Sequence, residues 1–458
     1  MIRNNIMLLT DSYKISHYKQ YPPGTTTVYS YFESRGGKFK DVTFFGLQYL
    51  IKEYLTGIVV TKEKIEQAEA MYAIHFGTSE LFYKEGWMHI LNVHGGKLPI
   101  RIKAAPEGLP IPYSNVMMTV ENTDPKCFWL SNFLETLLVQ VWYGCTVATQ
   151  SREIKKLILK ALEETGDPAG IDFKLHDFGF RGVSSVESAS IGGAAHLINF
   201  MGSDTIGALS FIQDFYNTKG IFGFSIPAAE HSTITSWKRE NEKQAYENML
   251  TQYEKGLVAV VSDSYDIYNA CSTIWGGELK EMILKREGTL VVRPDSGIPK
   301  DVVLKVIEIL GEKLGFTVNA KGYKVLVPQI RVLQGDGVDY ESIGGILDNL
   351  KAHGWSADNI AFGMGGALLQ KVDRDTQKFA FKCSEAIVNG ERRDVYKDPI
   401  TDHGKKSKKG RLKLVKDQNG YKTVAEADLG KDELEIVFEN GEIKKQYSFE
   451  EVKANSML

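Results

Sequence analysis

The stretch VAVVSDSYD (258–266) is a run of aliphatic residues that ends in Ser and Asp, and the same pattern recurs in LVVRPDSG (290–297), IRVLQGDG (330–337) and IAFGMGG (360–366). Each stretch is followed by a segment with helical character. Runs that are apolar on both faces are typical of buried parallel strands, and their spacing of roughly 30–40 residues is the length of one βα unit. The pattern therefore predicts a parallel βα fold.

Polar residues follow each of these predicted strands at the point where the strand ends. Ligands bind at the carboxyl ends of parallel strands, so these residues are expected to converge on one site. Gly and Asp are also common in turns after any strand, but four such loops in succession, one with an arginine, favour a functional site. The residues expected there are Asp263, Arg293, Asp295, Asp336, Gly365 and Gly366.

Six or seven βα units follow one another from Phe173, which favours an irregular, partly closed parallel barrel at residues 151–374. Residues 1–150 and 375–458 instead contain alternating strands, with two Asn-Gly turns that are typical of β-hairpins. We expect both chain ends to form one α+β domain with antiparallel strands, in which residues 128–143 make one apolar helix. The predicted fold class is therefore α/β, with a barrel-like catalytic domain and a second α+β domain.

The composition is that of an ordinary globular protein, with 458 residues, 43% hydrophobic and 25% charged, and a net charge of −3. No global charge excess points to nucleic acid or to a membrane surface. The chain has no apolar run that could span a membrane and no signal-peptide core, so we expect a cytoplasmic protein. The cysteines form no Cys-X-X-Cys pair, which fits a reducing compartment and argues against a zinc site or a disulfide framework. They are Cys127, Cys145, Cys271 and Cys383.

Several longer motifs go beyond the general pattern of a βα barrel. They are TDSYKISHYKQYPPGT, FFGLQYL, KLHDFGFRGVSS, SIPAAEHSTITSW, VSDSYDIYNAC, RPDSG, QGDGVD and KKSKKGRL. With these motifs the chain resembles the nicotinamide phosphoribosyltransferase family over nearly its whole length. The resemblance implies transfer of a phosphoribosyl group from phosphoribosyl pyrophosphate to nicotinamide, with Mg²⁺ and with ATP hydrolysis coupled through a phosphohistidine. It also implies a homodimer with shared active sites, in which the second domain contributes to dimerisation and phosphate binding.

Four residues match family positions around the nicotinamide ring. The resemblance implies that Phe178 and Tyr13 sandwich the ring, the tyrosine coming from the other subunit, and offset stacking is worth about 0.5–1.5 kcal/mol per pair. Without the motif, Phe178 would be equally well explained as a core residue. Asp204 corresponds to the acceptor for the carboxamide NH₂, and Arg293 to the donor near the carboxamide oxygen. A nicotinate carboxylate would be repelled by Asp204.

Other matches concern the ribose and the phosphates. Glycine amides can approach a phosphate closely because no Cβ intervenes, which suits Gly365 and Gly366. The resemblance places Asp295, Gly335 and Asp336 near the ribose, and Arg35, Arg374, Lys382, Lys397 and Lys405 near the pyrophosphate. For the basic segment KKSKKGRLK (405–413) a solvated loop is the simple alternative. A nucleic-acid patch is less favoured because no aromatic residues alternate with the lysines.

His231, in the motif PAAEH, resembles the phosphorylated histidine of the family. An imidazole nucleophile needs a partner that orients it, and Asp263 is the candidate, with Glu230 and Arg181 nearby in the predicted site. The chain departs from the family pattern at Phe180, Ala259 and Ala367. The residues that would bind a metal ion stay open.

Two alternatives remain at this stage. One is a nicotinate or quinolinate phosphoribosyltransferase on the same fold, which Asp204 disfavours because an acid-binding pocket should be net positive. The other is a non-catalytic binding or signalling protein that keeps the fold. The presence of His231, Asp263, Arg293 and Asp295 favours an enzyme instead.

Overall fold

The computed structural model describes residues 5–218, 220–401 and 406–457, and its contacts divide the chain into two compact units. Unit 1 comprises the described parts of residues 1–149, 212–218 and 373–457. Unit 2 comprises those of residues 150–211 and 219–372. Both chain ends thus contribute to unit 1, whereas unit 2 is built from the middle of the chain.

Unit 2 is organised around a six-stranded parallel sheet with the strand order β7-β6-β13-β12-β9-β8. All four strands of the repeated sequence pattern belong to this sheet, so the prediction of a parallel βα fold is confirmed. The strands are β6 (Leu175–Asp177), β7 (Gly202–Ser203), β8 (Lys255–Val261), β9 (Glu287–Arg293), β12 (Ile330–Gln334) and β13 (Ile360–Met364).

The two edges of this sheet are linked by the segment 222–229, which forms no regular strand. Phe224 makes a parallel bridge to Gly202 of β7, and Ala228 makes one to Ala259 of β8. The Ala259 amide donates to the Pro227 carbonyl at 2.9 Å, and the Ala229 amide donates back to the Ala259 carbonyl at 2.9 Å. The barrel is therefore irregular and only partly closed, as the sequence predicted.

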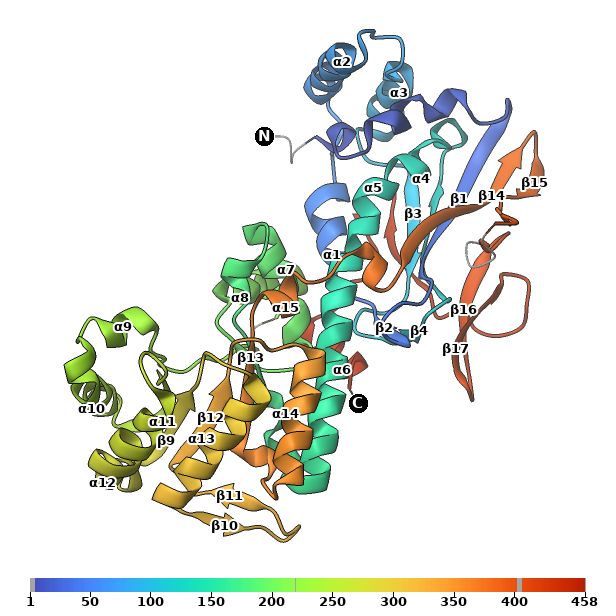
Figure 1. Ribbon diagram of the computed structural model, residues 1–458. Helices are drawn as coiled ribbons and strands as arrows, with labels where there is room; N and C mark the ends of the chain where they lie inside the picture. Colours follow the sequence, from blue (N-terminus) through green and yellow to red (C-terminus); the bar gives the residue numbers. More distant parts are fainter. Residues whose placement is uncertain (1–4, 219, 402–405, 458) are drawn as a thin grey trace. The chain divides into compact units, whose positions relative to one another are not determined.

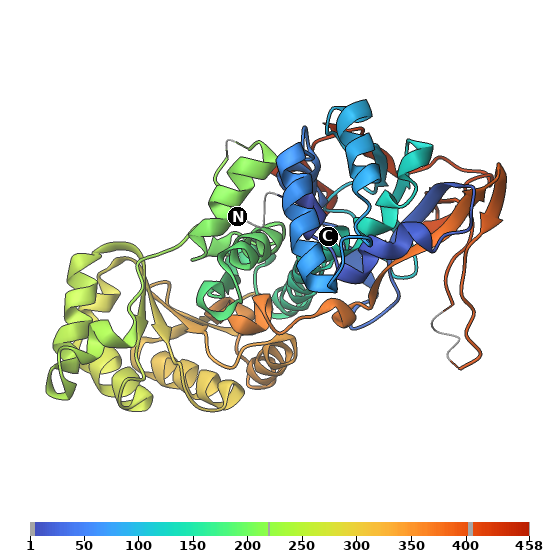
Figure 2. The same cartoon turned by 90° about the horizontal axis from the view of Figure 1, so that it is seen from above.

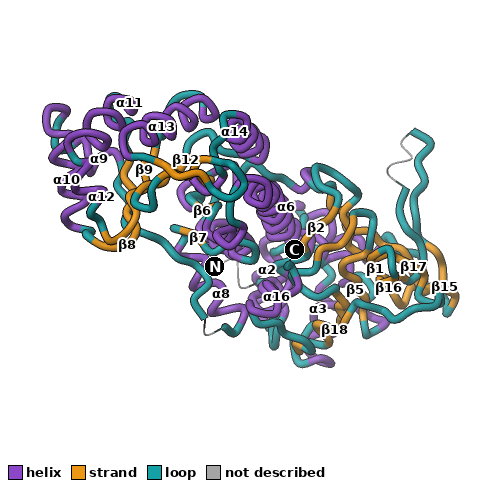
Figure 3. Tube along the Cα trace, turned by 90° about the horizontal axis from the view of Figure 1, so that it is seen from below, coloured by secondary structure: helices purple, strands orange, loops and turns teal. Residues whose placement is uncertain are grey.

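Helices surround the strands of unit 2, as Figures 1 and 3 show for α13 and α14 beside β9 and β12. Helix α13 begins with Pro299, which suits a first helical position, and α14 begins with a capping box between Asp339 and Ser342. The helices of this part are α7 (Val186–Leu197), α9 (His231–Thr235), α10 (Glu242–Gln252), α11 (Ile267–Asn269), the π-helix η10 (Ala270–Glu278), α12 (Lys280–Leu284), α13 (Pro299–Leu314), α14 (Tyr340–Ala352) and α15 (Gly366–Leu369). Two of the boundaries between the units fall inside helices, namely α6 (Trp142–Thr165) and α8 (Ile206–Tyr216).

Unit 1 contains an antiparallel seven-stranded sheet with the order β15-β14-β1-β5-β3-β18-β19, whose β14–β15 end appears in orange in Figure 2. Both predicted Asn-Gly hairpins are present, with Asn389 at φ 51° and Gly390 at φ 79° in the first. Positive φ at both central residues is the geometry that such hairpin turns require. The strands are β1 (Thr25–Ser34), β3 (Ile100–Ala104), β5 (Val116–Asn122), β14 (Phe379–Val388), β15 (Glu391–Asp394), β18 (Glu435–Glu439) and β19 (Glu442–Ile443).

Shorter elements complete both units. Three two-stranded sheets pair β2 (Asp41–Thr43) with β4 (Pro110–Pro112), β10 (Phe316–Val318) with β11 (Lys324–Leu326), and β16 (Leu412–Asp417) with β17 (Gly420–Ala425). The helices of unit 1 include α1 (Leu47–Leu50), α2 (Lys62–Phe76), α3 (Lys84–His94) and α16 (Phe449–Asn455). Among the described residues, no helix is long and apolar enough to cross a membrane.

The predicted single helix at 128–143 is wrong. The structure has α4 (Leu130–Phe133), α5 (Glu135–Leu138) and a 3₁₀ turn, and the continuous helix α6 begins only at Trp142. Leu134, at φ −79° and ψ −7°, interrupts the α conformation between the first two helices. Trp129 and Phe133 both pack edge-on against Trp87 of α3, so tertiary packing of the aromatic rings outweighs the helical tendency of the segment.

Candidate active site

The ring of Phe178, which follows β6, lies against the backbone of β13. A Cβ atom added to Gly363 would lie only 2.0 Å from Cε2 of Phe178, so the aromatic ring occupies space that only a glycine leaves open. The same ring packs against the buried residues Ala259, Val291 and Leu333. Phe178 is therefore partly a core residue, and its half-buried ring also forms an aromatic wall at the carboxyl end of the barrel strands.

Asp204, just after β7, is held beside this wall by two hydrogen bonds. His176 Nε2 donates to Asp204 Oδ1 at 2.9 Å, and the Ser225 hydroxyl donates to the same oxygen. The His176 ring is also 5.0 Å from the Phe178 ring, which connects the carboxylate to the aromatic wall. Burial raises the pKa of Asp204, but these hydrogen bonds and the charge of Arg293 outweigh it and lower that pKa overall. The Asp204 side chain is therefore ionised at neutral pH. It is also 47% exposed, so a ligand can reach it.

A group of charged side chains follows β8, β9 and β12. Arg293 Nε lies 3.8 Å from Asp295 Oδ1, and this buried Nε has no hydrogen-bond partner among the described residues. Burial raises the pKa of Asp295; the charge of Arg293 opposes this, and the charges of Asp263 and Asp336 add to it. The carboxylates of Asp263 and Asp336 thus lie close enough to Asp295 to repel it. This edge of the barrel favours a ligand that carries positive charge or a bound cation.

His231 and Asp263 form the predicted pair. His231 Nε2 lies 3.0 Å from Asp263 Oδ1, and the imidazole is 47% exposed whereas the carboxylate is 4% exposed. A buried carboxylate that orients an exposed imidazole is the arrangement that a nucleophilic histidine needs. Glu230 caps no helix amide but accepts a hydrogen bond from Ser232. Arg181 is exposed in the turn after Phe178 and forms no ion pair with the described residues.

Glycines line the remaining strand ends. A Cβ on Gly335 would meet the Phe178 ring at 3.3 Å and Asp295 Oδ1 at 3.4 Å, so the backbone after β12 lies between these two groups. The amides of Gly365 and Gly366 donate to no group in the described part of the chain, and a Cβ on Gly366 would contact nothing within 4 Å. The loop after β13 can therefore be approached closely by an anion.

Unit 1 holds the predicted basic residues in a cleft of its own. The cleft has a volume of about 710 Å³, and Tyr13 is part of its lining. Burial lowers the pKa of Lys382; Glu135 opposes this, and the neighbouring positive charges lower it further. Acidic residues also line the cleft, but the cations outnumber them, which favours an anionic ligand; the acidic residues are Asp11, Glu135 and Asp375. The cationic residues that line it are Arg35, Arg374, Lys378, Lys382 and Lys397.

The basic segment after residue 405 is largely neutralised by the protein itself. Arg411 binds Glu121 at 2.7 Å and Glu385 at 2.9 Å, and Lys408 pairs with the buried Glu33. These contacts explain most of the local charge as structural and leave little of it for a nucleic acid. Lys405 lies outside the described residues.

Some residues of the site were not predicted from the sequence. His176 and Ser225 hold Asp204, and Lys378 joins the cationic cleft. His176 was within a quoted strand end, but its side chain acts on a carboxylate 28 residues further along the chain. Only the pairing of β6 with β7 brings the two together.

The solved structures most informative for the fold are two enzymes of pyridine metabolism. Nicotinate-nucleotide pyrophosphorylase from Pyrococcus furiosus matches with a TM-score of 0.62 and 16% identity, over 99% of this chain and 95% of that one. Human nicotinic acid phosphoribosyltransferase matches with a TM-score of 0.52 and 13% identity, over 98% and 92% of the two chains. At these identities the likeness concerns the fold alone.

Sequence comparison defines the class of protein. The nicotinate phosphoribosyltransferase (NAPRTase) family matches residues 173–442, and the nicotinamide phosphoribosyltransferase N-terminal domain matches residues 5–102. The chain therefore belongs to the nicotinate phosphoribosyltransferase family.

Relatives that match nearly the whole chain are nicotinamide phosphoribosyltransferases. The chain is 52% identical to nicotinamide phosphoribosyltransferase of Xanthomonas campestris pv. campestris, over 99% of this chain and 98% of the relative. It is 33% identical to nicotinamide phosphoribosyltransferase of Acinetobacter baylyi, over 98% and 97% of the two chains. The resemblance predicted from the motifs is thus confirmed.

The contact between Gly363 and Phe178 can be tested by a double-mutant cycle. Gly363→Ala is expected to lower the free energy of unfolding by about 1–3 kcal/mol, because the new methyl group overlaps the ring. In a Phe178→Ala background the same substitution should cost much less, a coupling of about 1–3 kcal/mol in denaturant titrations. Gly345→Ala is the control and should raise the free energy of unfolding. Gly345 lies on the exposed face of α14, and a Cβ added there would meet no atom within 4 Å. Additivity of the Gly363 and Phe178 costs would refute the contact.

Proposed function

We propose that the protein transfers the 5-phosphoribosyl group from phosphoribosyl pyrophosphate to nicotinamide, forming nicotinamide mononucleotide and pyrophosphate for NAD salvage. The observation that carries this proposal is the ionised Asp204 held beside the Phe178 wall by His176. Such a carboxylate accepts a hydrogen bond from a carboxamide NH₂ and repels a carboxylate. The family relationship to full-length nicotinamide phosphoribosyltransferases supports the same choice of base.

The barrel edge suits the chemistry at the ribose. Departure of pyrophosphate leaves positive charge on the ring carbon and oxygen of the sugar, and carboxylates aimed at that charge stabilise the transition state. Asp295 and Asp336 are the residues we assign to this role, with Gly335 allowing the sugar to approach the Phe178 side of the pocket. Arg293 donates to the carboxamide oxygen, while Phe178 and Tyr13 stack on the two faces of the pyridine.

The leaving pyrophosphate needs compensating positive charge. We assign this role to Arg35, Arg374, Lys382 and Lys397 in the cleft of unit 1, together with Lys405, and to the free amides of Gly365 and Gly366 in unit 2. The carboxylates of Asp263, Asp295 and Asp336 provide oxygen donors of the kind that Mg²⁺ prefers, and the repulsion of Asp295 by the other two fits a bound cation. Magnesium bound there with the pyrophosphate would neutralise charge on the leaving group.

We further propose that ATP phosphorylates His231. Asp263 holds Nε2 of the ring, so the half-exposed imidazole is fixed and its other nitrogen, Nδ1, would attack the γ-phosphorus of ATP with release of ADP. Two further residues complete the proposed catalytic set. Arg181 is exposed and follows Phe178 by three residues, and Glu230 directly precedes His231. The four free cysteines fit a reducing compartment, which we take to be the cytoplasm. We also propose a homodimer, in which Tyr13 of one subunit reaches the site of the other.

Two other functions remain as alternatives. A nicotinate- or quinolinate-specific enzyme would place a substrate carboxylate next to the ionised Asp204, which costs binding energy. A non-catalytic binding protein would have no need for the oriented pair of His231 and Asp263 or for a cationic cleft.

Base choice tests the proposal directly. With phosphoribosyl pyrophosphate and Mg²⁺, the wild-type protein should form nicotinamide mononucleotide and should use nicotinate far less well. Asp204→Asn should lower kcat/KM for nicotinamide roughly tenfold to a hundredfold, the cost of a lost charge-assisted hydrogen bond, and should narrow the preference over nicotinate. Because the pKa of Asp204 is lowered, its charge and hence the preference should persist into mildly acidic solution.

The matched control is Asp348→Asn on the exposed face of α14, which should leave both rates unchanged. Chromatographic separation of the two mononucleotides gives the rates. Equal use of nicotinate and nicotinamide by the wild-type protein would disprove the assignment of Asp204.

The role of His231 has a separate test. Incubation with γ-labelled ATP and Mg²⁺ should give a protein phosphate that is labile to acid and stable to base. His231→Ala should abolish both this label and ATP hydrolysis, yet retain some ATP-independent synthesis, because other residues bind the ring, the ribose and the pyrophosphate. His353→Ala, at the exposed C-cap of α14, serves as the control and should keep the label. A label that persists in His231→Ala would place the phosphoryl group elsewhere.

A further inference from the structure

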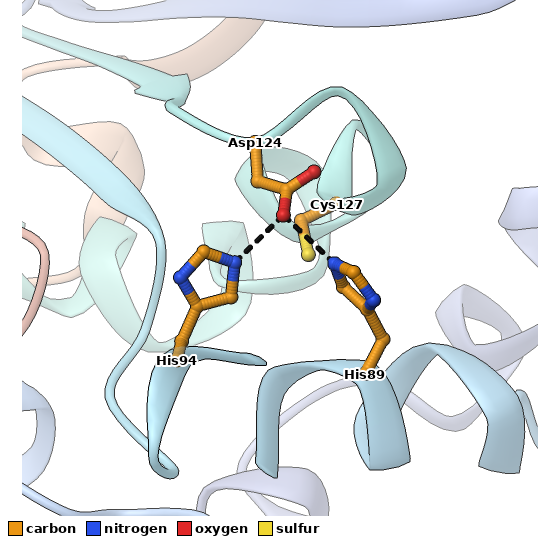
Figure 4. Close-up of side chains that lie close together, drawn as sticks. All are labelled: His89, His94, Asp124 and Cys127. Atoms are coloured by element: carbon orange, nitrogen blue, oxygen red, sulfur yellow. Dashed lines mark hydrogen bonds and ion pairs between the residues drawn. The ribbon is translucent and has the colours of Figure 1, made fainter. Parts of the chain in front are cut away.

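Unit 1 contains a second cluster of reactive side chains, none of which has a role in the proposed reaction. Figure 4 shows His89, His94, Asp124 and Cys127 pointing toward one another. One nitrogen, oxygen or sulfur atom of each residue lies within 4.8 Å of those of the other three. Asp124 Oδ2 accepts hydrogen bonds from His89 Nε2 at 2.8 Å and from His94 Nε2 at 2.7 Å. Four potential metal donors thus converge on one point.

The four residues come from two segments with well-defined backbones. His89 and His94 belong to α3, which ends at His94 because Gly95 adopts φ 60° as its C-cap. Asp124 is the N-cap of the 3₁₀ turn η5 (Pro125–Cys127), which follows β5 and includes Cys127. The donors are therefore placed by a helix end and by a capped turn.

Aromatic packing fixes these two segments against each other. Trp87 on α3 is 1% exposed and packs edge-on against Trp129, with ring centroids 4.8 Å apart. Trp129 follows Cys127 by two residues, so the helix that carries the histidines and the turn that carries the other donors share one buried core. A metal ion would meet donors that are already near their final positions.

Hydrogen bonds from neighbouring residues orient Asp124, as the hydrogen-bond partners of metal ligands do in known metal sites. The Lys126 amide donates to Asp124 Oδ1 at 2.8 Å, which leaves Oδ2 directed at the imidazoles. Asn122 Nδ2 and the Cys127 amide both donate to the Asp124 carbonyl, at 2.8 and 2.9 Å. Partners of this kind typically contribute tenfold to a hundredfold to metal affinity.

We propose that His89, His94, Asp124 and Cys127 form a four-coordinate structural zinc site. Two imidazoles, a carboxylate and a thiolate match the nitrogen, oxygen and sulfur ligands that zinc takes, and four protein ligands define a closed, structural site. Two neutral rings with two anions exactly balance a divalent cation. Zinc would link the C-terminal end of α3 to the turn after β5 through its bonds to residues of both segments.

Binding requires small, definite changes. Zinc–ligand bonds of about 2.0–2.3 Å in a tetrahedral arrangement separate the donors by roughly 3.3–3.8 Å, so both imidazoles must withdraw slightly from Asp124. Each ring must carry its proton on Nδ1 so that the Nε2 lone pair faces the metal. The Cys127 thiol, whose pKa is raised to about 12 by burial and by the Asp124 charge, must release its proton to solvent. The histidines and Asp124 are 16–25% exposed, which leaves a route for the ion.

Cobalt substitution tests the site, because Co²⁺ reports both its geometry and its ligands. The full-length protein is stripped with a chelator, desalted and titrated with Co²⁺. We expect the intense visible bands of four-coordinate cobalt and a thiolate-to-cobalt charge-transfer band in the near ultraviolet, both of which saturate at one ion per chain even if the carboxylates of unit 2 bind further Co²⁺. One equivalent of Zn²⁺ should remove these bands. Zinc alone should also raise the thermal unfolding midpoint.

Variants assign the ligands. Cys127→Ala should lose the charge-transfer band and bind at least tenfold more weakly, and the His89→Gln/His94→Gln double variant should lose the zinc-dependent rise in unfolding midpoint. His353→Gln removes an exposed histidine outside the cluster and should behave as the wild-type protein. Absence of saturable cobalt binding, cobalt bound without the thiolate band, or a band that survives in Cys127→Ala would each overturn the proposal. If a variant does not fold, the wild-type spectrum and stoichiometry still decide.

Discussion

Parallel pairing of the strands in unit 2 is the constraint on which the candidate site depends. It brings Phe178, Asp204, Asp263 and Arg293 to the same edge, although they are separated by as many as 115 residues in sequence. Strands as short as β6 and β7 are long enough for this purpose, because each places only one or two side chains at the carboxyl edge of the sheet. Gly363 adds the finer requirement that the backbone of β13 leave room for an aromatic ring.

The two units differ in the charge of their candidate sites. In unit 2 burial raises the pKa of Asp295, and the charges of Asp263 and Asp336 add to this effect while Arg293 and His231 oppose it. In unit 1 burial lowers the pKa of Lys382, and the neighbouring cations lower it further. The carboxylates suit a sugar that becomes positive, whereas the cations suit a phosphate.

The sequence predicted much of this arrangement where the signal is local. Apolar runs that end in Asp or Arg identified the strands and several site residues, and the Asn-Gly pairs identified the hairpins. Side chains from distant segments were harder to place. Arg35 and Lys382 share a cleft only because β1 pairs with β14, and Ser225 reaches Asp204 from a bridging segment with no strand pattern.

One failed prediction has a physical cause that the chain itself shows. The helix expected at 128–143 is broken by the packing of Trp129 and Phe133 on Trp87, which outweighs its helical tendency. The lack of a Cys-X-X-Cys pair argued against a zinc site, and that prediction stays untested; the site we propose combines one cysteine with two histidines and an aspartate. The spacing of His89 and His94 on one helix end, and of Asp124 and Cys127 on one turn, was the available signal.

We propose that Tyr13 of one subunit completes the barrel site of another in a homodimer that carries out phosphoribosyl transfer. Subunit mixing tests it most directly: Tyr13→Ala and Asp295→Ala proteins are each assayed alone and then after verified subunit exchange. A shared site predicts that random pairing restores up to about a quarter of wild-type nicotinamide mononucleotide synthesis, because half of the dimers then contain one intact site of two. Activity that stays at the sum of the two inactive parents after exchange would contradict the account.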